Sequence, residues 1–302
     1  MKRFLTLIAV FFALVGVVDV CCGFGFDYLK SHAKGGETYK HYYIAEKCEA
    51  DVLILGSSRA ARHYVPSIIE DSLGLSCYNA GEPGCGIIPA YAYYKMVAER
   101  HKPKLVIYEV TPEYDYFMAD DYSKYLGSVK QYKSKEPVRE LYSTFGSRYE
   151  LWKSISNMYE YNSCIINYSL NLIKTSKSNK GFEPLFGQLN PDLISKDDIK
   201  KEMSLDSLKC IYFEKLVKDI TNNNVRLLII SSPDFYESNE LTTNQYEYAR
   251  YIADKYSVPF LDFSNDGRFK GKLKLFQDDC HLNYQGAEIF TKYVVNDLKN
   301  KI

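Results

Sequence analysis

Five short apolar runs, each followed by polar or glycine-containing sequence, constrain the fold of this chain more than any other feature. They read DVLIL at 51–55, SCYN at 76–79, KLVIYEV at 104–110, VRLLIIS at 225–231 and VPFLDF at 258–263. Unbroken apolar runs of this length are typical of strands covered on both faces. Helix-like sequence separates them. Strands that alternate with helices predict an α/β domain of three layers, in which a mostly parallel five-stranded sheet lies between helices.

The connections between these strands predict where a functional site would lie. Right-handed crossovers place the carboxyl ends of parallel strands at one edge of the sheet, and ligands of such sheets bind at that edge. The loops that follow the strands are therefore expected to converge. They span 56–59, 80–86, 111–117, 232–239 and 264–281.

The chain begins with two basic residues and a long apolar segment. Residues 4–18 carry no charge, and after Asp19 the sequence VCCGFGF extends the apolar segment to Phe26. A bilayer span takes about twenty residues, so the extended segment is long enough. Because positive charge stays on the cytoplasmic side, we interpret residues 1–28 as an uncleaved signal anchor, with the rest of the chain on the exported side. A cleaved signal peptide is the alternative and leads to the same compartment.

Two further segments fall outside the strand–helix alternation. Residues 29–50 are polar and mixed in composition, which predicts a stalk before the domain at 51–302. From about 116 to 201 the sequence is rich in Tyr, Ser and Lys and contains the single Trp. Because this stretch leaves and re-enters at the edge where the loops converge, we predict a helical cap over the site. An insertion packed at the side of the domain is the alternative.

Composition excludes several classes of function. The 38 basic and 38 acidic residues cancel, so no overall charge favours nucleic acid. The eight cysteines form no CxxC pair and no Cys/His cluster with zinc spacing. The glycines at 81, 84 and 86 lack the GxGxxG order, and a P-loop is missing from the sequence. We therefore expect no cofactor, no metal and no nucleic-acid partner.

The tripeptide Gly56-Ser57-Ser58 follows the first predicted strand, at the edge where the loops converge. In one interpretation it is a tight turn in which a serine only caps the following helix. In the other, Ser58 is presented for chemistry. A nucleophilic hydroxyl requires a base within hydrogen-bond reach and a third group that orients this base.

One of the five histidines is expected at the same edge. His32 and His41 lie in the predicted stalk, and His63 lies within the first helix, more than a turn past the serines. His101 precedes a strand and therefore belongs to the opposite edge. His281 remains, in the last loop before the final helix.

Two acidic residues are candidates to orient His281. Asp278 lies three residues before it, so one short turn can carry both the base and its carboxylate. Asp279 is the rival. Together with the serine turn, this loop predicts a site for nucleophilic catalysis.

Three blocks of this sequence resemble the SGNH (GDSL-type) hydrolases. They are Gly56-Ser57-Ser58, the loop NAGEPG at 79–84 and DDCHLN at 278–283, in the family's order and each after a predicted strand. The resemblance covers roughly residues 51–112 and 225–300 and implies a flavodoxin-like fold. It implies that Ser58 is the nucleophile, with Ser57 in place of the family's aspartate. It further implies that Ser58 and Gly84 donate backbone N–H groups to an oxyanion hole, and that Asp278 and His281 complete the triad.

One block departs from the family pattern. The family's Gly-x-Asn-Asp motif supplies an asparagine to the oxyanion hole, whereas this chain reads EVTPEYD at 109–115. Loss of one oxyanion donor costs on the order of a hundredfold in rate. Thr111, Tyr114 or a residue of the cap is the candidate to replace it. Arg59, next to the nucleophile, either binds a substrate carboxylate or phosphate or pairs with an acid such as Glu82 or Glu113.

The resemblance implies a membrane-anchored serine esterase or O-acyltransferase. The expected substrate is an acylated, most simply acetylated, exported carbohydrate or cell-envelope polymer. The missing asparagine supports an alternative, in which the chain is a non-catalytic relative that binds a glycan or an assembly partner.

Overall fold

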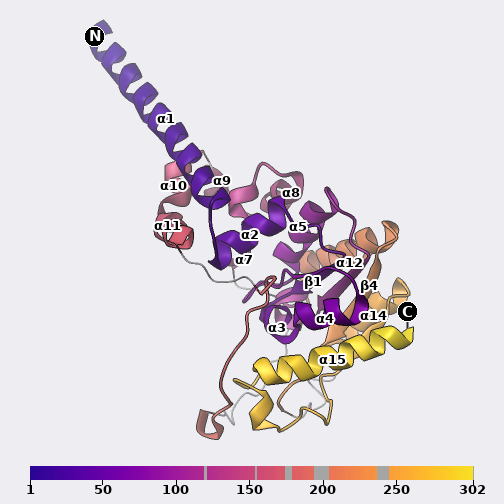
Figure 1. The fold of residues 1–302 in the computed structure, drawn as a ribbon. Coiled ribbons are helices and arrows are strands. Elements are labelled where there is room, and N and C mark those ends of the chain that lie inside the picture. The colour runs from indigo at the N-terminus through magenta and orange to yellow at the C-terminus, as the bar shows by residue number, and fades with distance from the viewer. Residues whose placement is uncertain (119–120, 154, 174–178, 194–203, 237–244, 302) are drawn as a thin grey trace.

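The fold is known from a computed structural model. It describes residues 1–118, 121–153, 155–173, 179–193, 204–236 and 245–301. Figure 1 shows a compact body, from which one long N-terminal helix projects.

A five-stranded parallel sheet forms the centre of the body. Its strands are β1 (Val52–Gly56), β2 (Cys77–Asn79), β3 (Leu105–Glu109), β4 (Arg226–Ser231) and β5 (Phe260–Asp262), in the order β2-β1-β3-β4-β5. Four lie within the predicted apolar runs and β1 extends one residue beyond its run, to Gly56, so the predicted strands are confirmed. The register pairs Gly56 with Glu109, and Glu109 with Ile230. The carboxyl ends of β1, β3 and β4 therefore form one row, and the chain leaves this row into the serine turn.

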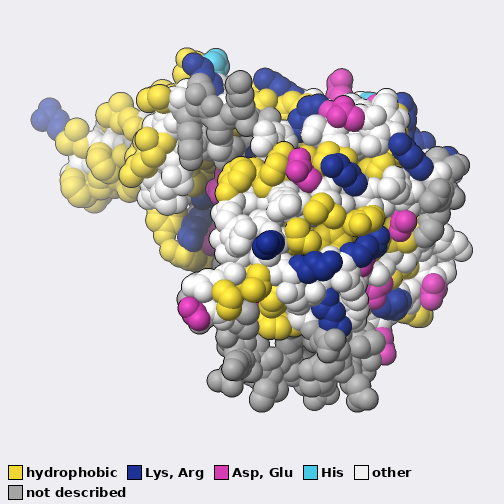
Figure 2. Space-filling model, turned by 60° about the horizontal axis from the view of Figure 1, so that its bottom comes forward, with side chains coloured by type: hydrophobic (Ala, Val, Ile, Leu, Met, Phe, Trp, Pro, Cys, Tyr) yellow, Lys and Arg dark blue, Asp and Glu magenta, His cyan; other side chains and the backbone are white. Residues whose placement is uncertain are grey.

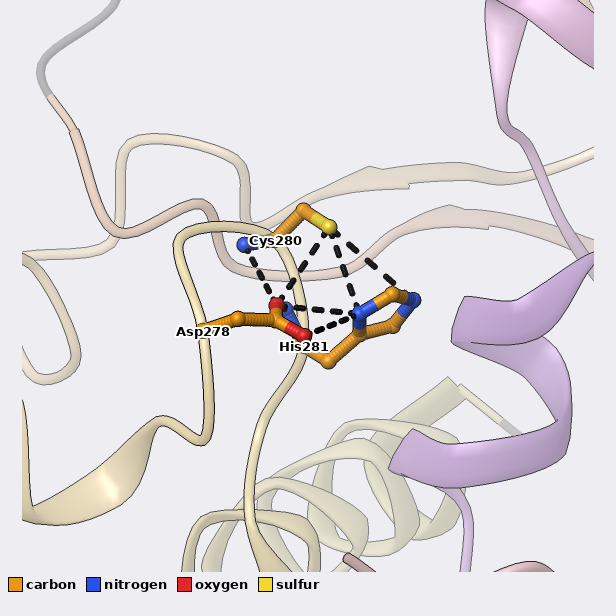
Figure 3. A group of neighbouring side chains, drawn as sticks. All are labelled: Asp278, Cys280 and His281. Atoms are coloured by element: carbon orange, nitrogen blue, oxygen red, sulfur yellow. Dashed lines mark hydrogen bonds and ion pairs between the residues drawn. The ribbon is translucent and has the colours of Figure 1, made fainter. Parts of the chain in front are cut away.

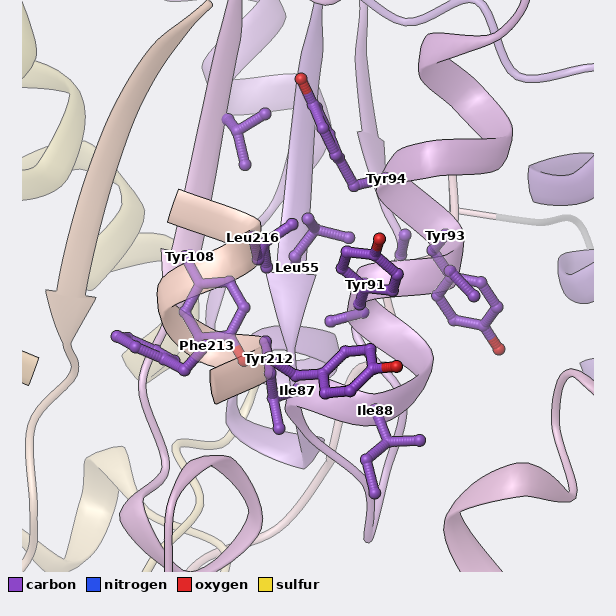
Figure 4. Packing of buried hydrophobic residues seen from close by; sticks show 14 of the residues in the cluster. Leu55, Ile87, Ile88, Tyr91, Tyr93, Tyr94, Tyr108, Tyr212, Phe213 and Leu216 are labelled. Atoms are coloured by element: carbon purple, nitrogen blue, oxygen red, sulfur yellow. The ribbon is translucent and has the colours of Figure 1, made fainter. Parts of the chain in front are cut away.

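Helices cover both faces of the sheet and confirm the three-layer α/β architecture. They are α3 (Ser58–His63), α4 (Pro66–Leu73), α5 (Ile87–Ala98), α12 (Ser207–Asn222), α14 (Glu247–Lys255) and α15 (Tyr284–Lys301). Because strand side chains alternate between faces, Leu53 and Leu55 pack towards α5 and α12. Val52 and Ile54 face the other way and belong to the core beneath α15. Figure 4 shows the first of these layers, where tyrosines of α5 and aromatic residues of α12 surround Leu55 and Tyr108.

The N-terminal helix α1 (Lys2–Ser31) has two parts with different surroundings. Residues 1–18 are all exposed, whereas Phe26 and Lys30 are buried against the body. Hydrophobic side chains cover the projecting part, with basic side chains at its tip (Figure 2). Among the described residues, α1 is the one helix whose length and composition suit a membrane span, with a mean hydropathy of 2.6; a signal sequence has the same properties.

The segment predicted as a stalk is folded onto the domain. Residues 36–46 form α2 (Gly36–Glu46), in which Ile44 and Ala45 are completely buried. Lys40 and His41 are also buried and form ion pairs with Glu183 and Glu82. The polar residues that suggested a solvated stalk instead form buried ion pairs with residues far away in sequence.

The inserted stretch consists of short helices. They are α6 (Pro112–Asp115), α7 (Ser123–Leu126), η1 (Lys130–Tyr132), α8 (Glu136–Phe145), α9 (Arg148–Lys153), α10 (Asn157–Tyr161), η2 (Asn162–Cys164), α11 (Ile165–Ile173) and η3 (Pro191–Leu193); η4 (Leu273–Leu275) lies in the last loop. α8 packs on α5, and α10 and α11 pack on α1 (Figure 1). These helices thus pack at the side of the domain, as in the alternative. Residues 179–193 of the same insertion lie against the loops of the predicted site edge instead, where the Glu183 N–H donates to Ala61 O at 2.9 Å and the Leu189 N–H donates to Phe276 O at 2.7 Å. A cap at 116–201 therefore stays a prediction. The part of that prediction at 194–201 lies outside the described residues.

Candidate active site

The turn after β1 requires a glycine and presents Ser58. Gly56 has a φ of +134°, and a Cβ at this position would lie 2.4 Å from the carbonyl oxygen of Glu109. Ser57 is buried, and its Oγ lies 2.7 Å from Thr111 Oγ1. Ser58 is half-buried at the first position of α3. The Ser57 side chain makes no capping hydrogen bond at the start of α3, and the Ser58 hydroxyl has a different partner.

That partner is His281, which a tight turn holds in place. Asp278 Oδ1 accepts the backbone N–H groups of Cys280 at 3.0 Å and His281 at 2.8 Å. Both Asp278 oxygens lie 2.9 Å from His281 Nδ1 (Figure 3). On the other side of the ring, Nε2 lies 2.8 Å from Ser58 Oγ. The structure therefore brings together Ser58, His281 and Asp278, and the hydrogen bond is made by Asp278 and not by its rival Asp279.

The contacts of Asp278 and His281 determine where the proton between them lies. Burial raises the pKa of Asp278, but the hydrogen bond and the charge of His281 outweigh burial and lower it to about 2. An ionised carboxylate only accepts hydrogen bonds, so the proton of a neutral His281 ring lies on Nδ1. Nε2 is then an acceptor that faces the Ser58 hydroxyl. This is the arrangement in which an imidazole can take a proton from a serine.

Cys280 adds a third donor atom beside the histidine. Its Sγ lies 3.3 Å from His281 Nδ1 and 3.4 Å from Asp278 Oδ1 (Figure 3). These three side chains are close enough to hold a metal ion such as zinc. A metal on Nδ1 would displace the proton shared with Asp278, so metal binding and the serine–histidine arrangement exclude each other.

The loop after β2 lies against the serine turn. The Glu82 N–H donates to Gly56 O at 2.9 Å, and the Asn79 side chain donates to Ala60 O at 2.7 Å. Gly84 is exposed with a φ of +72°. Within the described part of the chain, the backbone N–H groups of Gly84 and Ser58 have no hydrogen-bond acceptor. Two donors expected for an oxyanion hole thus remain unused.

Thr111 and Tyr114, the residues suggested as replacements for the missing asparagine, both contact neighbouring side chains. Thr111 is buried, and its hydroxyl is engaged with Ser57. The Thr111 N–H donates to Asp115 Oδ2 at 2.6 Å, and burial raises the pKa of Asp115 to about 7. Tyr114 is half-buried and packs edge-on against Tyr125. These contacts hold the loop after β3 in place, and Thr111 is turned towards the neighbouring serine.

Arg59 is buried, and both acids suggested as its partners are wrong. Its guanidinium lies 3.3 Å from Glu109 and 3.0 Å from Asp234. It also donates to the side chain and the carbonyl of Ser232. Glu82 pairs instead with His41. Glu109 ends β3, and Ser232 and Asp234 follow β4. In the sheet β3 adjoins β1 and β4 adjoins β3, so strand order and not sequence distance selects these partners.

His63 is a polar residue of this edge that the sequence did not reveal. It is completely buried. Its Nε2 accepts the N–H of Leu282, the residue after His281, at 3.0 Å, and its Nδ1 lies 2.7 Å from Ser232 Oγ. Ser232 in turn donates to Glu109 at 2.6 Å. A buried polar network thus joins α3, β3, β4 and the His281 loop. In the sequence, the one signal of this role of His63 is its position four residues after Arg59.

Comparisons with known proteins complete the description. A family model without a description matches residues 157–302. The curated proteins contain no match. Among solved structures, the acetyl xylan esterase AlAXEase is 12% identical, with 83% of this chain and 98% of that chain covered and a TM-score of 0.41.

Two further solved structures are similar at the same level. A family two carbohydrate esterase from Clostridium thermocellum in complex with cellohexaose is 9% identical, with 83% of this chain and 64% of that chain covered and a TM-score of 0.40. A structure described as a platelet activating factor from Streptococcus pneumonia is 11% identical, with 92% and 98% covered and a TM-score of 0.43. The α/β fold follows from the order and direction of this chain's own strands.

Proposed function

We propose that this chain is a serine esterase or O-acyltransferase in which Ser58 is the nucleophile. One observation carries the proposal: the continuous hydrogen-bonded line from Asp278 through His281 to Ser58 Oγ, with distances of 2.9 and 2.8 Å. Acyl transfer needs a nucleophile, a base and an orienting acid in this order. Neither Ser58 nor His281 is fully buried, and the His281 side chain is 13% exposed.

In the proposed mechanism, His281 Nε2 takes the proton of Ser58 as Oγ attacks an ester carbonyl. Asp278 keeps the imidazole in the required tautomer and stabilises the imidazolium that forms. The N–H groups of Ser58 and Gly84 stabilise the negative charge on the tetrahedral intermediate. His281 then protonates the leaving alcohol, and water or a sugar hydroxyl takes the acyl group from Ser58.

The substrate class is proposed from the sequence. The resemblance to SGNH hydrolases, together with the apolar N-terminal helix, supports an acylated carbohydrate or cell-envelope polymer on the exported side of a membrane. Hydrolysis and transfer share the same acyl-enzyme and differ in the acceptor that reaches it. An acetyl ester is the simplest first substrate for a test.

Matched serine variants test this function. We expect Ser58→Ala to lower kcat/KM for p-nitrophenyl acetate by at least about a thousandfold, because the nucleophile is lost. Ser57→Ala removes the neighbouring hydroxyl and its bond to Thr111, which is worth about 1 kcal/mol, so its kcat/KM should stay within about tenfold of the wild-type value. Steady-state kinetics of the full-length chain in detergent would make both comparisons.

Equal activity of the wild type and Ser58→Ala would refute the proposal. The alternative, a non-catalytic glycan-binding protein, rests on the missing asparagine and on the engaged hydroxyl of Thr111. It predicts no turnover by the wild type and glycan binding that survives Ser58→Ala. Calorimetric titration of both proteins with acetylated oligosaccharides separates the two functions.

A further inference from the structure

Nine large apolar side chains between residues 149 and 173 are exposed among the described residues. We call this set the apolar platform; its members and their exposed fractions are Tyr149 57%, Trp152 71%, Ile155 71%, Met158 45%, Tyr159 49%, Ile165 49%, Ile166 69%, Leu170 57% and Ile173 80%. Helices α9 and α10 adjoin, since the hydroxyl oxygens of Tyr149 and Tyr159 lie 2.6 Å apart. Exposed apolar surface that is contiguous marks a site of interaction with a protein or a membrane. The platform therefore needs a partner.

Helix α11 shows that the exposure follows a pattern. Ile166, Leu170 and Ile173 recur at i, i+4 and i+7, which places them on one face. The other face is buried through Tyr168 and Asn171, which are 6% and 7% exposed. A surface helix of a water-soluble domain has the opposite arrangement, with its apolar face inward and its polar face outward. The outer face of α11 is thus suited to an apolar environment.

The platform is attached to the helix expected to span a membrane. The Asp19 carboxylate of α1 accepts hydrogen bonds from Ser156 Oγ at 2.6 Å and from the backbone N–H groups of Asn157 and Met158 at 2.9 and 3.0 Å. Further along α1, the ring of Phe26 packs at 5.3 Å from that of Tyr161. Figure 1 shows α9, α10 and α11 gathered around the point where α1 leaves the body.

The depth of this contact follows from helix geometry. Hydrocarbon about 30 Å thick takes about twenty helical residues at 1.5 Å each, so a span that starts at Phe4 ends near Gly23. Asp19 lies four residues before that end, or roughly 6 Å inside it. The first turn of α10 binds Asp19 and must lie at a similar depth. The bilayer surface therefore cuts through the inserted helices instead of passing beyond them.

We propose that the apolar platform is a membrane-binding surface, which sits in the interface of the lipid bilayer beside α1. Tryptophan and tyrosine are the residues enriched at this level, and helices with an outward apolar face bind there. The hydrogen bonds from α10 satisfy Asp19, a charge that would otherwise be costly near hydrocarbon. Helix α1 and the platform together hold the body, and with it Ser58, in one orientation towards the membrane. The proposal does not depend on the activity of Ser58.

The single tryptophan of the chain makes the proposal directly testable. The full-length protein would be placed in nanodiscs of phosphatidylcholine and phosphatidylglycerol, with or without bromine atoms on the acyl chains. We expect the emission of Trp152 to be quenched by the brominated lipids. We also expect a blue-shifted emission maximum and a smaller acrylamide quenching constant than for the same protein after unfolding in urea.

A matched control moves the single tryptophan from the platform to α14. In the variant Trp152→Phe/Tyr251→Trp the only tryptophan lies on α14, at a position that is 58% exposed and away from α1. Brominated lipids should leave its emission unchanged, and acrylamide should quench it readily.

Two outcomes would overturn the proposal. If acrylamide quenches Trp152 as readily as the control and brominated lipids do not, the platform faces water. If Trp152 is protected from acrylamide but bromine has no effect, a protein covers the platform, either a second copy of this chain or another partner.

Discussion

His63 and Arg59 are buried residues that hold the elements of the candidate site together. Arg59 ties α3 to the ends of β3 and β4, and His63 ties α3 to the backbone beside His281. Because Nε2 of His63 accepts the Leu282 N–H, its proton must lie on Nδ1, which faces Ser232. The network therefore needs a neutral imidazole. Burial, and then the charge of Arg59, lower the pKa of His63 well below its usual value.

This shift predicts a pH dependence of stability. The unfolded chain protonates His63 at about pH 6.5, whereas the folded protein resists protonation, so the unfolded state binds more protons below that pH. Stability should fall by about 1.4 kcal/mol per pH unit below pH 6.5 because of this group alone. In His63→Gln, which does not titrate, the loss should be smaller. Thermal unfolding midpoints at pH 7.5, 6.5 and 5.5 would compare the two proteins, and parallel curves would contradict the prediction.

Individual residues of the site were predictable to different degrees. His281 could be found because elimination left one histidine on the expected edge, and Asp278 because its partner lies in the same turn. The partners of Arg59 could not be found, because Glu109 and Asp234 come next to Arg59 only through the order of the strands. His63 was passed over because a histidine within a helix has no visible partner until the helix is packed.

At the scale of elements, the junction of β1 and α3 sets the position of Ser58. Gly56 ends the strand opposite Glu109, and its left-handed backbone turns the chain sharply into the helix. The next strand lies so close that no side chain fits at this position. The sharp turn therefore requires a glycine at position 56.

Gly56→Ala should therefore destabilise the protein more than an ordinary glycine replacement. Gly74 is a matched control, because it has a φ of +66° but nothing within 4 Å of a Cβ. Gly74→Ala should cost about 1 kcal/mol, from its backbone conformation alone. Gly56→Ala should cost at least about 2 kcal/mol, because the clash with Glu109 is added. Equal losses of unfolding free energy in urea would show that the contact at Gly56 is relaxed.

Elements with a strong hydrophobic pattern were predicted well, and the others were not. All five strands coincide with the apolar runs to within one residue at their carboxyl ends or lie inside them, because a buried parallel strand leaves a continuous apolar signature. Helix α2 was interpreted as a stalk because its buried residues include Lys40 and His41. Their burial depends on acidic partners 143 and 41 residues away, which no local pattern contains.

At the scale of the whole molecule, the parallel topology joins the two ends of the domain. Ser58 and His281 lie 223 residues apart in sequence and meet at the carboxyl edge of the sheet. The parallel direction of the strands, with right-handed crossovers, predicted this meeting. The placement of the insertion could not be predicted in the same way, because the sequence shows where a segment leaves the sheet but not which surface it covers. Its helices contact α1 and α5.

The central claim is that His281 activates Ser58, and covalent labelling tests it most directly. The full-length wild type would be treated with a fluorophosphonate, digested and mapped by mass spectrometry, beside His281→Ala and the control His101→Ala. We predict an adduct on Ser58 in the wild type and in His101→Ala, and a labelling rate at least about a thousandfold lower in His281→Ala. No adduct on Ser58, or equal labelling rates in all three proteins, would contradict the account.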